Sequence, residues 1–445
     1  MGFNLFRNSK FVLVISLLFS GSMWFYVQHV MIPHQIAEAA AVGSPRGNLS
    51  DLYPRWLGAR ELLLHHRDPY SPQVTEEIQA GYYGRPLDPK RPQDPRDKQA
   101  FAYPVYVVFL LAPVIHLQFS VVQAGFRWFL ILLTAASVML WFRILRWQVP
   151  VVVTASAIAI TLGSFPVLQG IKLQQLTLLV SGLISFGALL LVQGYFAAAG
   201  IVLAFATIKP QLALPLSCWL CLWCLEKWHL RQRFIWAYAG AMIVLCSASE
   251  VVLPGWTGKF LAAMSDYMRY TGGAGSVLDV LLTPRWGRAL SVAIIGLLAV
   301  MAWRLRRVNH DSPVFRFMLV LLLVATTNIM PKTAAYNQIL LMPAVMLLVR
   351  QAKVLWPNSW ASRSILMICS GILLWPWIAA VSLLCARLFV PAQVIQRAWA
   401  QPLYTTFTIP LAAIVLLTFY FRKLSNPEIY ADESALSLHS LPVPR

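Results

Sequence analysis

Long apolar segments separated by short basic loops run through most of this 445-residue chain. Twelve of the segments are long enough, or nearly long enough, to cross a bilayer, because a helical span needs about 20 apolar residues. They lie near residues 11–32, 120–142, 149–165, 174–193, 195–208, 210–225, 234–253, 289–303, 315–330, 334–349, 364–384 and 403–421. This pattern predicts an all-α polytopic membrane protein with about 12 transmembrane helices.

Basic residues cluster before the first predicted span and then after the second, sixth, eighth, tenth and twelfth. The clusters lie at 7 and 10, 143 and 146, 227–233, 304–307, 350–363 and 422–423. Because cytoplasmic loops carry an excess of Lys and Arg, both termini are predicted to lie in the cytoplasm of a multi-pass plasma or inner membrane protein. The net charge of +19 is therefore explained by membrane orientation and does not indicate a nucleic-acid partner.

One apolar run does not fit this count. The segment "FAYPVYVVFLLAPVIHL" (101–117) is short and contains Pro104 and Pro113. If it crossed the membrane, the following basic loop would lie on the wrong side. We interpret it as an interfacial or re-entrant segment on the outer face, with a thirteen-span chain as the alternative.

The resulting domain organisation has four parts. Residues 1–32 form the cytoplasmic N-terminus and an uncleaved first helix, 33–119 an outer-face loop, 120–424 the transmembrane core, and 425–445 a disordered cytoplasmic tail. Within the loop, Leu52 to His66 is predicted as an amphipathic interfacial helix whose arginines, Arg55 among them, reach lipid headgroups. Prolines at every third position from Pro86 to Pro95 predict an extended polyproline II spacer. A later outer stretch, "TGGAGS" (271–276), is predicted to close over a substrate.

Asp51 is the candidate catalytic residue of the loop. A carboxylate at the outer surface could act as a general base that removes a proton from an attacking hydroxyl. The alternative is structural, because Asp51 directly precedes the predicted helix and Asp is a favoured N-cap. Asp68, in "RDPY", is interpreted as a turn residue.

Three predicted outer turns each carry a lysine together with amides. Outer lysines are uncommon under the positive-inside rule, so this repetition predicts a bound anion such as a phosphate. Snorkelling of each lysine to lipid headgroups is the alternative. The candidates for binding substrate or phosphate are Gln169, Lys172, Gln174, Lys209, Lys332 and Asn337.

The chain has no nucleotide-binding signature. Neither a Gly-rich loop followed by Lys-Ser/Thr nor a dinucleotide fingerprint is present. If a group is transferred on the outer face, its donor is therefore expected to be lipid-linked.

The order of several motifs resembles the GT-C membrane glycosyltransferases, most closely glycosyltransferase family 87. An early Asp in the first outer loop is followed by "RDPY", "FAYPV", "LQGIKLQQ" and "ATIKPQ". The resemblance implies a polyprenyl-phosphate-sugar-dependent hexosyltransferase of the cell envelope, mannosyltransferase-like, with Asp51 as base and inversion at the sugar. Val105 replaces the second proline of the family's Tyr-Pro-Pro. Tyr336, Asn337 and Gln338 stand near the place where many relatives have a histidine.

The resemblance and the residues together give one hypothesis. Asp51 is the base, while Lys172, Lys209 and Lys332 hold the lipid phosphate, and Trp56 and Tyr103 line the sugar or acceptor site. The expected partners are a polyprenyl-phosphate-linked sugar donor, a lipid or glycan acceptor and membrane lipids. No cofactor or metal is required, because lysines can supply positive charge; a divalent ion at Asp51 is the open alternative.

Two other functions share parts of this pattern. A secondary transporter would have a similar number of spans, but it usually places ionisable residues near the bilayer midplane and often has related halves. A lipid-linked glycan ligase or polymerase would share the outer-face chemistry. Its large outer loop is expected late in the chain, where only the short segment 385–402 is available here.

Overall fold

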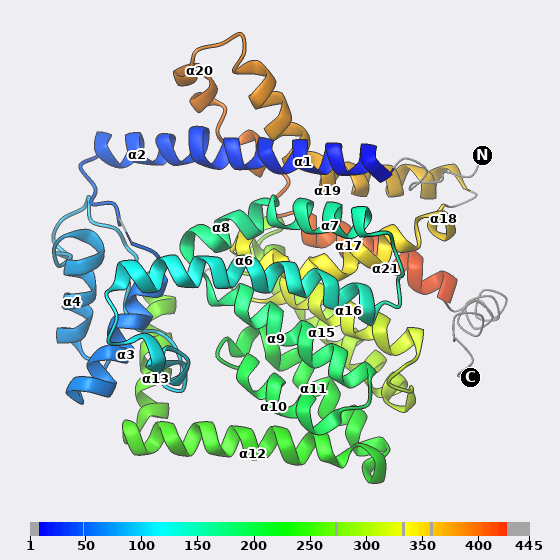
Figure 1. Cartoon of the computed structure of the whole chain (residues 1–445), viewed down its shortest axis with the longest axis horizontal. Helices are drawn as coiled ribbons and strands as arrows, with labels where there is room; N and C mark the ends of the chain where they lie inside the picture. Colours follow the sequence, from blue (N-terminus) through cyan, green and yellow to red (C-terminus); the bar gives the residue numbers. More distant parts are fainter. Residues whose placement is uncertain (1–8, 48, 272–274, 332–333, 357–358, 425–445) are drawn as a thin grey trace.

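The computed structural model describes residues 9–47, 49–271, 275–331, 334–356 and 359–424, and these residues form helices and loops without a strand. Figure 1 shows most of the long helices running roughly side by side. Helix α1 (Ser9–Phe25) lies along one face of the molecule and α12 (Trp228–Val252) along the opposite face. Most of the remaining helices fill the space between them.

Five helices are long and apolar enough to cross a membrane within the described ranges. The first is continuous from Ser9 to Ala41, because α1, the π-helix η1 (Tyr26–Met31) and α2 (Ile32–Ala41) follow one another without a break. The others are α6 (Phe119–Ile144), α12, α15 (Pro284–Arg304) with the 3-10 turn η3 (Leu305–Arg307), and α19 (Trp360–Ala386). Helices α7 (Val151–Leu162) and α8 (Phe165–Leu173) form a sixth if the pair, bent by 61°, is counted as one span. The protein is thus a helical, multi-pass membrane protein.

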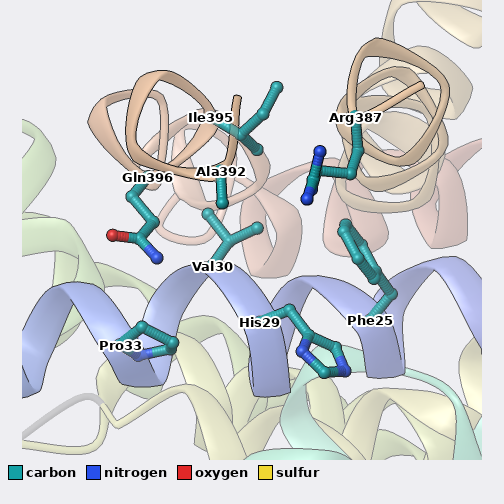
Figure 2. A pocket seen from close by; sticks show the side chains of 8 residues that line it. All are labelled: Phe25, His29, Val30, Pro33, Arg387, Ala392, Ile395 and Gln396. Atoms are coloured by element: carbon teal, nitrogen blue, oxygen red, sulfur yellow. The ribbon is translucent and has the colours of Figure 1, made fainter. Parts of the chain in front are cut away.

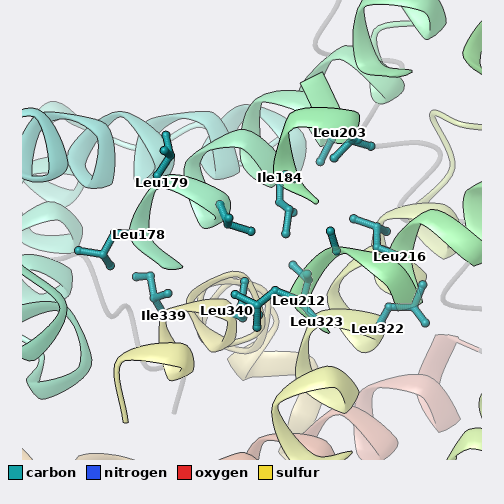
Figure 3. Close-up of a cluster of buried hydrophobic side chains, with 14 of the residues drawn as sticks. Leu178, Leu179, Ile184, Leu203, Leu212, Leu216, Leu322, Leu323, Ile339 and Leu340 are labelled. Carbon is teal, nitrogen blue, oxygen red and sulfur yellow. The ribbon is translucent and has the colours of Figure 1, made fainter. Parts of the chain in front are cut away.

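The other predicted spans correspond to shorter helices. They are α9 (Leu176–Val192), α10 (Phe196–Ala206), α11 (Pro210–Glu226), α16 (Pro313–Ile329), η4 (Ala335–Leu341) followed by α17 (Met342–Arg350), and α21 (Ile409–Leu424). Seventeen residues, the length of α9 and α16, extend only about 26 Å. Both helices are buried on almost every side, and Figure 3 shows their leucines in one cluster with side chains from α10, α11 and η4. The count of twelve crossings remains a prediction.

Helix α10 packs closely on α12 through a glycine. A Cβ atom added at Gly200 would lie 2.5 Å from the Phe234 carbonyl oxygen and 2.9 Å from the Tyr238 amide nitrogen. Small residues allow such close approach between membrane helices. This contact holds α10 against α12, and it therefore also positions the turn that follows α10.

The first loop forms a small helical unit at one end of the bundle (Figure 1). Helix α3 (Leu52–His65) confirms the predicted helix, and α4 (Pro72–Tyr83) follows it, capped by the Ser71 hydroxyl. The run 101–117 contains only α5 (Val107–Leu111) and the 3-10 turn η2 (Ala112–Val114). Eight helical residues extend about 13 Å, which is shorter than the hydrocarbon core of a bilayer and counts against a thirteenth span. An interfacial position remains a prediction for these helices.

The remaining short elements connect the helices. They are α13 (Trp256–Tyr270), α14 (Val277–Leu281), α18 (Ala352–Leu355), α20 (Ala392–Arg397) and η5 (Gln401–Leu403). The centre of the predicted "TGGAGS" lid, the predicted disordered tail and Lys332 lie outside the described residues.

Two expectations for the loop are wrong. Residues 86–95 are not an extended spacer, because the Asp94 carboxylate pairs with Arg85 at 2.5 Å and accepts the Asp88 backbone N–H at 2.8 Å, and the chain folds back in turns. A polyproline II helix has no internal hydrogen bonds, whereas the Asp94 carboxylate accepts strong ones here.

The prediction for Arg55 is also wrong. Arg55 does not reach the lipid headgroups, because only 8% of the residue is exposed.

Candidate functional site

The start of α3 is fastened to the turn between α8 and α9. The Asp51 backbone N–H donates to the Leu173 carbonyl at 3.0 Å, and the Ser50 hydroxyl donates to the Gln174 side-chain carbonyl. Gln174 ends α8 in the left-handed region with φ +52°, and its amide donates to the Gln123 carbonyl. The bonds of Ser50 and Asp51 to this turn join residues more than 120 positions apart and bring two of the predicted outer segments together.

The Asp51 carboxylate does not cap its helix. It stands at the N-cap position of α3 without a side-chain cap hydrogen bond. Instead, Gln175 donates its amide N–H to Asp51 Oδ2, and the Tyr82 hydroxyl lies 3.5 Å from Asp51 Oδ1. Asp51 as a residue is partly exposed, and its carboxylate is held by Gln175 and lies near Tyr82.

Lys209 lies on the other side of Gln175. It precedes α11, whose first residue is Pro210, and its ammonium donates to Gln175 Oε1 at 3.0 Å and to Thr177 Oγ1 at 2.7 Å. The Thr177 hydroxyl in turn donates to Asn337 Oδ1 at 2.8 Å. One hydrogen-bonded network thus links the loop after α10, the start of α9 and η4 to Asp51.

A second buried cation, Arg55, lies one helical turn after Asp51. Its Nη2 donates to the Tyr103 hydroxyl at 2.7 Å, and its guanidinium carbon lies 4.2 Å from the centre of the Tyr103 ring. The Tyr70 hydroxyl donates to the Tyr103 carbonyl at 2.5 Å and holds that backbone in place. Arg55 Nε and Nη1 are buried and have no hydrogen-bond partner in the described part of the chain. Unpaired buried donors cost about 1–3 kcal/mol each, so these two favour an anionic ligand.

Burial and neighbouring charges shift the pKa values of the two ionisable groups in the network, Asp51 and Lys209. Removal from water raises the pKa of Asp51 above its ordinary value, and Arg55, Lys209 and Gln175 only partly offset this effect. The pKa of Lys209 is lowered well below its ordinary value by burial and by repulsion from Arg55. A carboxylate with a raised pKa is a better proton acceptor. An anion bound beside Lys209 and Arg55 would offset the burial and the repulsion that lower the pKa of Lys209, so the pair favours an anionic ligand.

The structure brings some of the predicted residues together and not others. Asp51, Lys209 and Asn337 lie in one hydrogen-bonded network, and Gln174 bonds Ser50 beside it. Tyr103 pairs with Arg55, which acts on Asp51 through its charge. Lys332 lies outside the described residues.

Trp56, Gln169 and Lys172 face other surroundings. Trp56 is buried, packs against Phe119 with ring centroids 5.3 Å apart, and donates its indole N–H to the Val114 carbonyl at 3.3 Å. Gln169 keeps a buried carbonyl oxygen without a partner among the described residues. Lys172, in the last turn of α8, lines a separate cleft.

The sequence prediction missed the residues that connect the network. Arg55, Thr177 and Tyr82 are not among the predicted site residues, whereas Gln175 stands in one of the predicted outer turns with a lysine and amides but has no assigned role. Arg55 is four residues after Asp51, and this spacing places both on one side of a helix. The four-residue spacing is therefore the feature of the sequence that indicates Arg55 as a neighbour of Asp51.

Two clefts lie on either side of η1, and neither is lined by Asp51. The first, of about 400 Å³, is lined by Phe25, His29, Val30, Pro33, Arg387, Ala392, Ile395 and Gln396; Figure 2 shows that the last four come from the segment facing η1. The second, of about 470 Å³, lies against α6, α7 and α8. Across the described ranges, no three His, Cys, Asp or Glu side chains gather as a metal site.

Comparison with known proteins gives one match. No curated protein matches the chain. The model of glycosyltransferase family 87 matches residues 101–331, a segment that covers more than half of the chain and contains Tyr103, Gln175, Thr177 and Lys209. The chain belongs to glycosyltransferase family 87 and is a membrane glycosyltransferase.

Proposed function

We propose that this glycosyltransferase moves a sugar, mannose or a similar hexose, from a polyprenyl-phosphate donor to a hydroxyl group of a lipid or glycan on the outer face of the membrane. The observation that carries the proposal is a carboxylate, Asp51, linked through Gln175 to a buried lysine, Lys209, and followed one turn later by a buried arginine with two donors that have no partner among the described residues. This arrangement offers a base and an anion site side by side.

The reaction proceeds as a single displacement. Asp51 accepts the proton of the acceptor hydroxyl while that oxygen forms a bond to the anomeric carbon of the sugar. The bond between that carbon and the phosphate oxygen breaks, and the lipid phosphate leaves with the electron pair. Attack opposite to the leaving group inverts the anomeric configuration.

The cations stabilise the leaving group. Arg55 and Lys209 are both buried, and hydrogen bonds from charged donors to phosphate oxygens are strong in a poorly hydrated site. Negative charge grows on the phosphate as the bond breaks, so the same contacts stabilise the transition state more than the bound donor. Lysines and an arginine supply the positive charge, and the proposal requires no metal or cofactor.

The other candidates take supporting roles in this proposal. Tyr103 lines the sugar or acceptor site beside Arg55, and Asn337 positions Lys209 through Thr177. The packing of Trp56 against Phe119 supports a structural role in holding α3.

The proposed topology has about twelve crossings with both termini in the cytoplasm. Its support is the alternation of basic clusters along the sequence. In this orientation the first loop, and with it Asp51, lies on the outer face, where lipid-linked donors are used.

The test is a transfer assay with purified protein in lipid. Radiolabelled polyprenyl-phosphate-mannose is incubated with a crude lipid extract and with wild-type protein, Asp51→Asn or Asp68→Asn. Asp68 is the matched control, because it is a carboxylate of the same loop that pairs with Lys259 at 2.9 Å. We expect label in a new product with wild type and Asp68→Asn, and a loss of at least about 100-fold with Asp51→Asn. Full activity of Asp51→Asn would exclude Asp51 as the base.

A further inference from the structure

The cleft between η1 and helices α6, α7 and α8 is separate from the Asp51 network. It encloses about 470 Å³, and most of its wall is apolar, formed by Val27, Ile32, Ile131, Leu162, Leu168 and Ile171. Trp24, at its edge, is 52% exposed. An open apolar cleft on the side of spanning helices is a surface that contacts hydrocarbon chains.

Two cations line this cleft together with the apolar wall. Lys172 is half-buried in the last turn of α8, and Arg127 is exposed on α6. Arg127 lies eight residues after Phe119, about 12 Å along the helix from its start, and an ionisable residue inside a spanning helix indicates a function by default. Within the described residues, neither side chain forms a hydrogen bond or an ion pair.

The positive charge of the cleft is not balanced by a carboxylate. None of its lining residues is acidic. A third cation, Arg46, is close enough to repel the charge on Lys172, and it donates to the Ile32 carbonyl at 3.2 Å. Cations in apolar surroundings are costly unless an anion accompanies them.

We propose that this cleft binds an anionic membrane lipid, with the lipid phosphate between Lys172 and Arg127 and a hydrocarbon chain along the apolar wall. The exposed amide of Gln28 lies on the same cleft and can donate to the headgroup. Charge complementarity selects the headgroup, while the apolar wall selects a lipid over a free phosphate ion.

The cleft on the other side of η1 lacks this combination. Arg387 donates to the Val390 carbonyl at 3.3 Å, and His29 stacks on Phe25 with ring centroids 5.3 Å apart (Figure 2). Its cation is therefore partnered within its own loop. The lipid proposal applies only to the cleft that contains Lys172.

Lipid binding at this cleft bears on the candidate active site through one short turn. Lys172 faces the cleft, whereas Gln174 and Gln175 bind Ser50 and Asp51. A bound lipid would therefore fix the end of α8 that carries the Asp51 partners. The binding proposal itself does not depend on the transfer reaction.

The experiment uses a phosphatidic acid with a photoactivatable group in its acyl chain. The purified full-length protein in an uncharged detergent is irradiated with this probe, and labelled peptides are mapped by mass spectrometry. We expect labelling of peptides from 24–32 and 127–131, competed by unlabelled phosphatidic acid but not by diacylglycerol or inorganic phosphate. Lys172→Gln combined with Arg127→Gln should reduce this labelling at least tenfold.

Two further variants separate the site from general effects. Arg143→Gln removes an exposed arginine at the other end of α6 and should label like wild type. Ile131→Trp fills the cleft without changing charge and should also reduce labelling. Equal labelling of wild type and the double variant, competition by diacylglycerol, or competition by inorganic phosphate alone would each overturn the proposal. Because the readout is labelling, a failure here leaves the proposed transfer reaction standing.

Discussion

Gln175 donates its amide N–H to Asp51 and accepts a hydrogen bond from Lys209 through its carbonyl oxygen. One neutral side chain therefore holds a carboxylate and a buried ammonium in a fixed relation. Gln175 is itself buried, with 2% of its surface exposed, so its position is set by packing as well as by these two bonds.

Replacing Gln175 should affect both neighbours. In Gln175→Leu, Asp51 loses a hydrogen bond to its ionised form, and Lys209 loses an acceptor. We expect transfer to fall about 10-fold to 100-fold and the acidic limb of the pH profile to move to higher pH. Gln175→Glu, which places a second carboxylate beside Asp51, should move that limb further. An unchanged pH profile for both variants would contradict the assigned contact.

The pH dependence of transfer should follow the environment of Asp51. Only the ionised carboxylate accepts a proton, so activity rises as pH passes upward through the pKa of Asp51. That pKa is raised, and the acidic limb should lie above the ordinary value of about 3.9. The wild-type profile of rate against pH measures this limb directly.

Two substitutions should shift this limb in opposite directions. Arg55 lowers the pKa of Asp51, and Asp97 raises it. Arg55→Met should therefore move the limb to higher pH, and Asp97→Asn should move it to lower pH. Comparison of the two profiles with wild type is the measurement. Shifts of the same sign would show that Asp51 is not the titrating base.

Lys209 should act mainly on the donor. Because its ammonium is proposed to bind the lipid phosphate, Lys209→Met should raise the KM for the donor at least tenfold and also lower kcat. Thr177→Val removes the hydroxyl that accepts from Lys209 and should show a smaller version of the same effect. Thr177→Ser keeps the hydroxyl and should behave like wild type. An unchanged KM for the donor in Lys209→Met would show that other residues bind the lipid phosphate.

The contact between α10 and α12 predicts a difference between two glycines. Gly200→Ala places a Cβ 2.5 Å from the Phe234 carbonyl oxygen, and the backbone must move. We expect a loss of stability of about 1–3 kcal/mol, as for other overpacked sites. Gly240→Ala, on α12, meets nothing within 4 Å and should be neutral or slightly stabilising. Thermal unfolding of the two variants tests the packing, and equal melting temperatures would contradict it.

The hydrophobic pattern predicted where helices form better than what surrounds them. Each predicted apolar run corresponds to helical structure, including the runs that became α9 and α16. Those two helices are buried by other helices, whereas α12 and α15 leave most of their apolar surface exposed. Composition alone does not separate a helix surrounded by protein from one surrounded by lipid, because both are apolar all round.

The same limit applies to the candidate site. Asp51 and Lys209 could be identified because charged groups are rare in this chain and stand at the edges of apolar runs. Arg55 was placed in the headgroups because the amphipathic pattern assigns arginines to the polar face. Its pairing with Tyr103 depends on how the segment 101–117 folds against α3, and local sequence does not carry that information.

The fastening of Asp51 to Leu173 and Gln175 has a consequence for biogenesis. The bonded residues are separated by more than 120 positions, and Lys209 follows later still. While the ribosome is still synthesising the chain, the first loop must wait for α8, α9 and the turn after α10 before its carboxylate acquires partners. Insertion into the bilayer and completion of the candidate site are therefore separate events, and we expect a fully inserted chain whose loop has not docked to be inactive in a transfer assay.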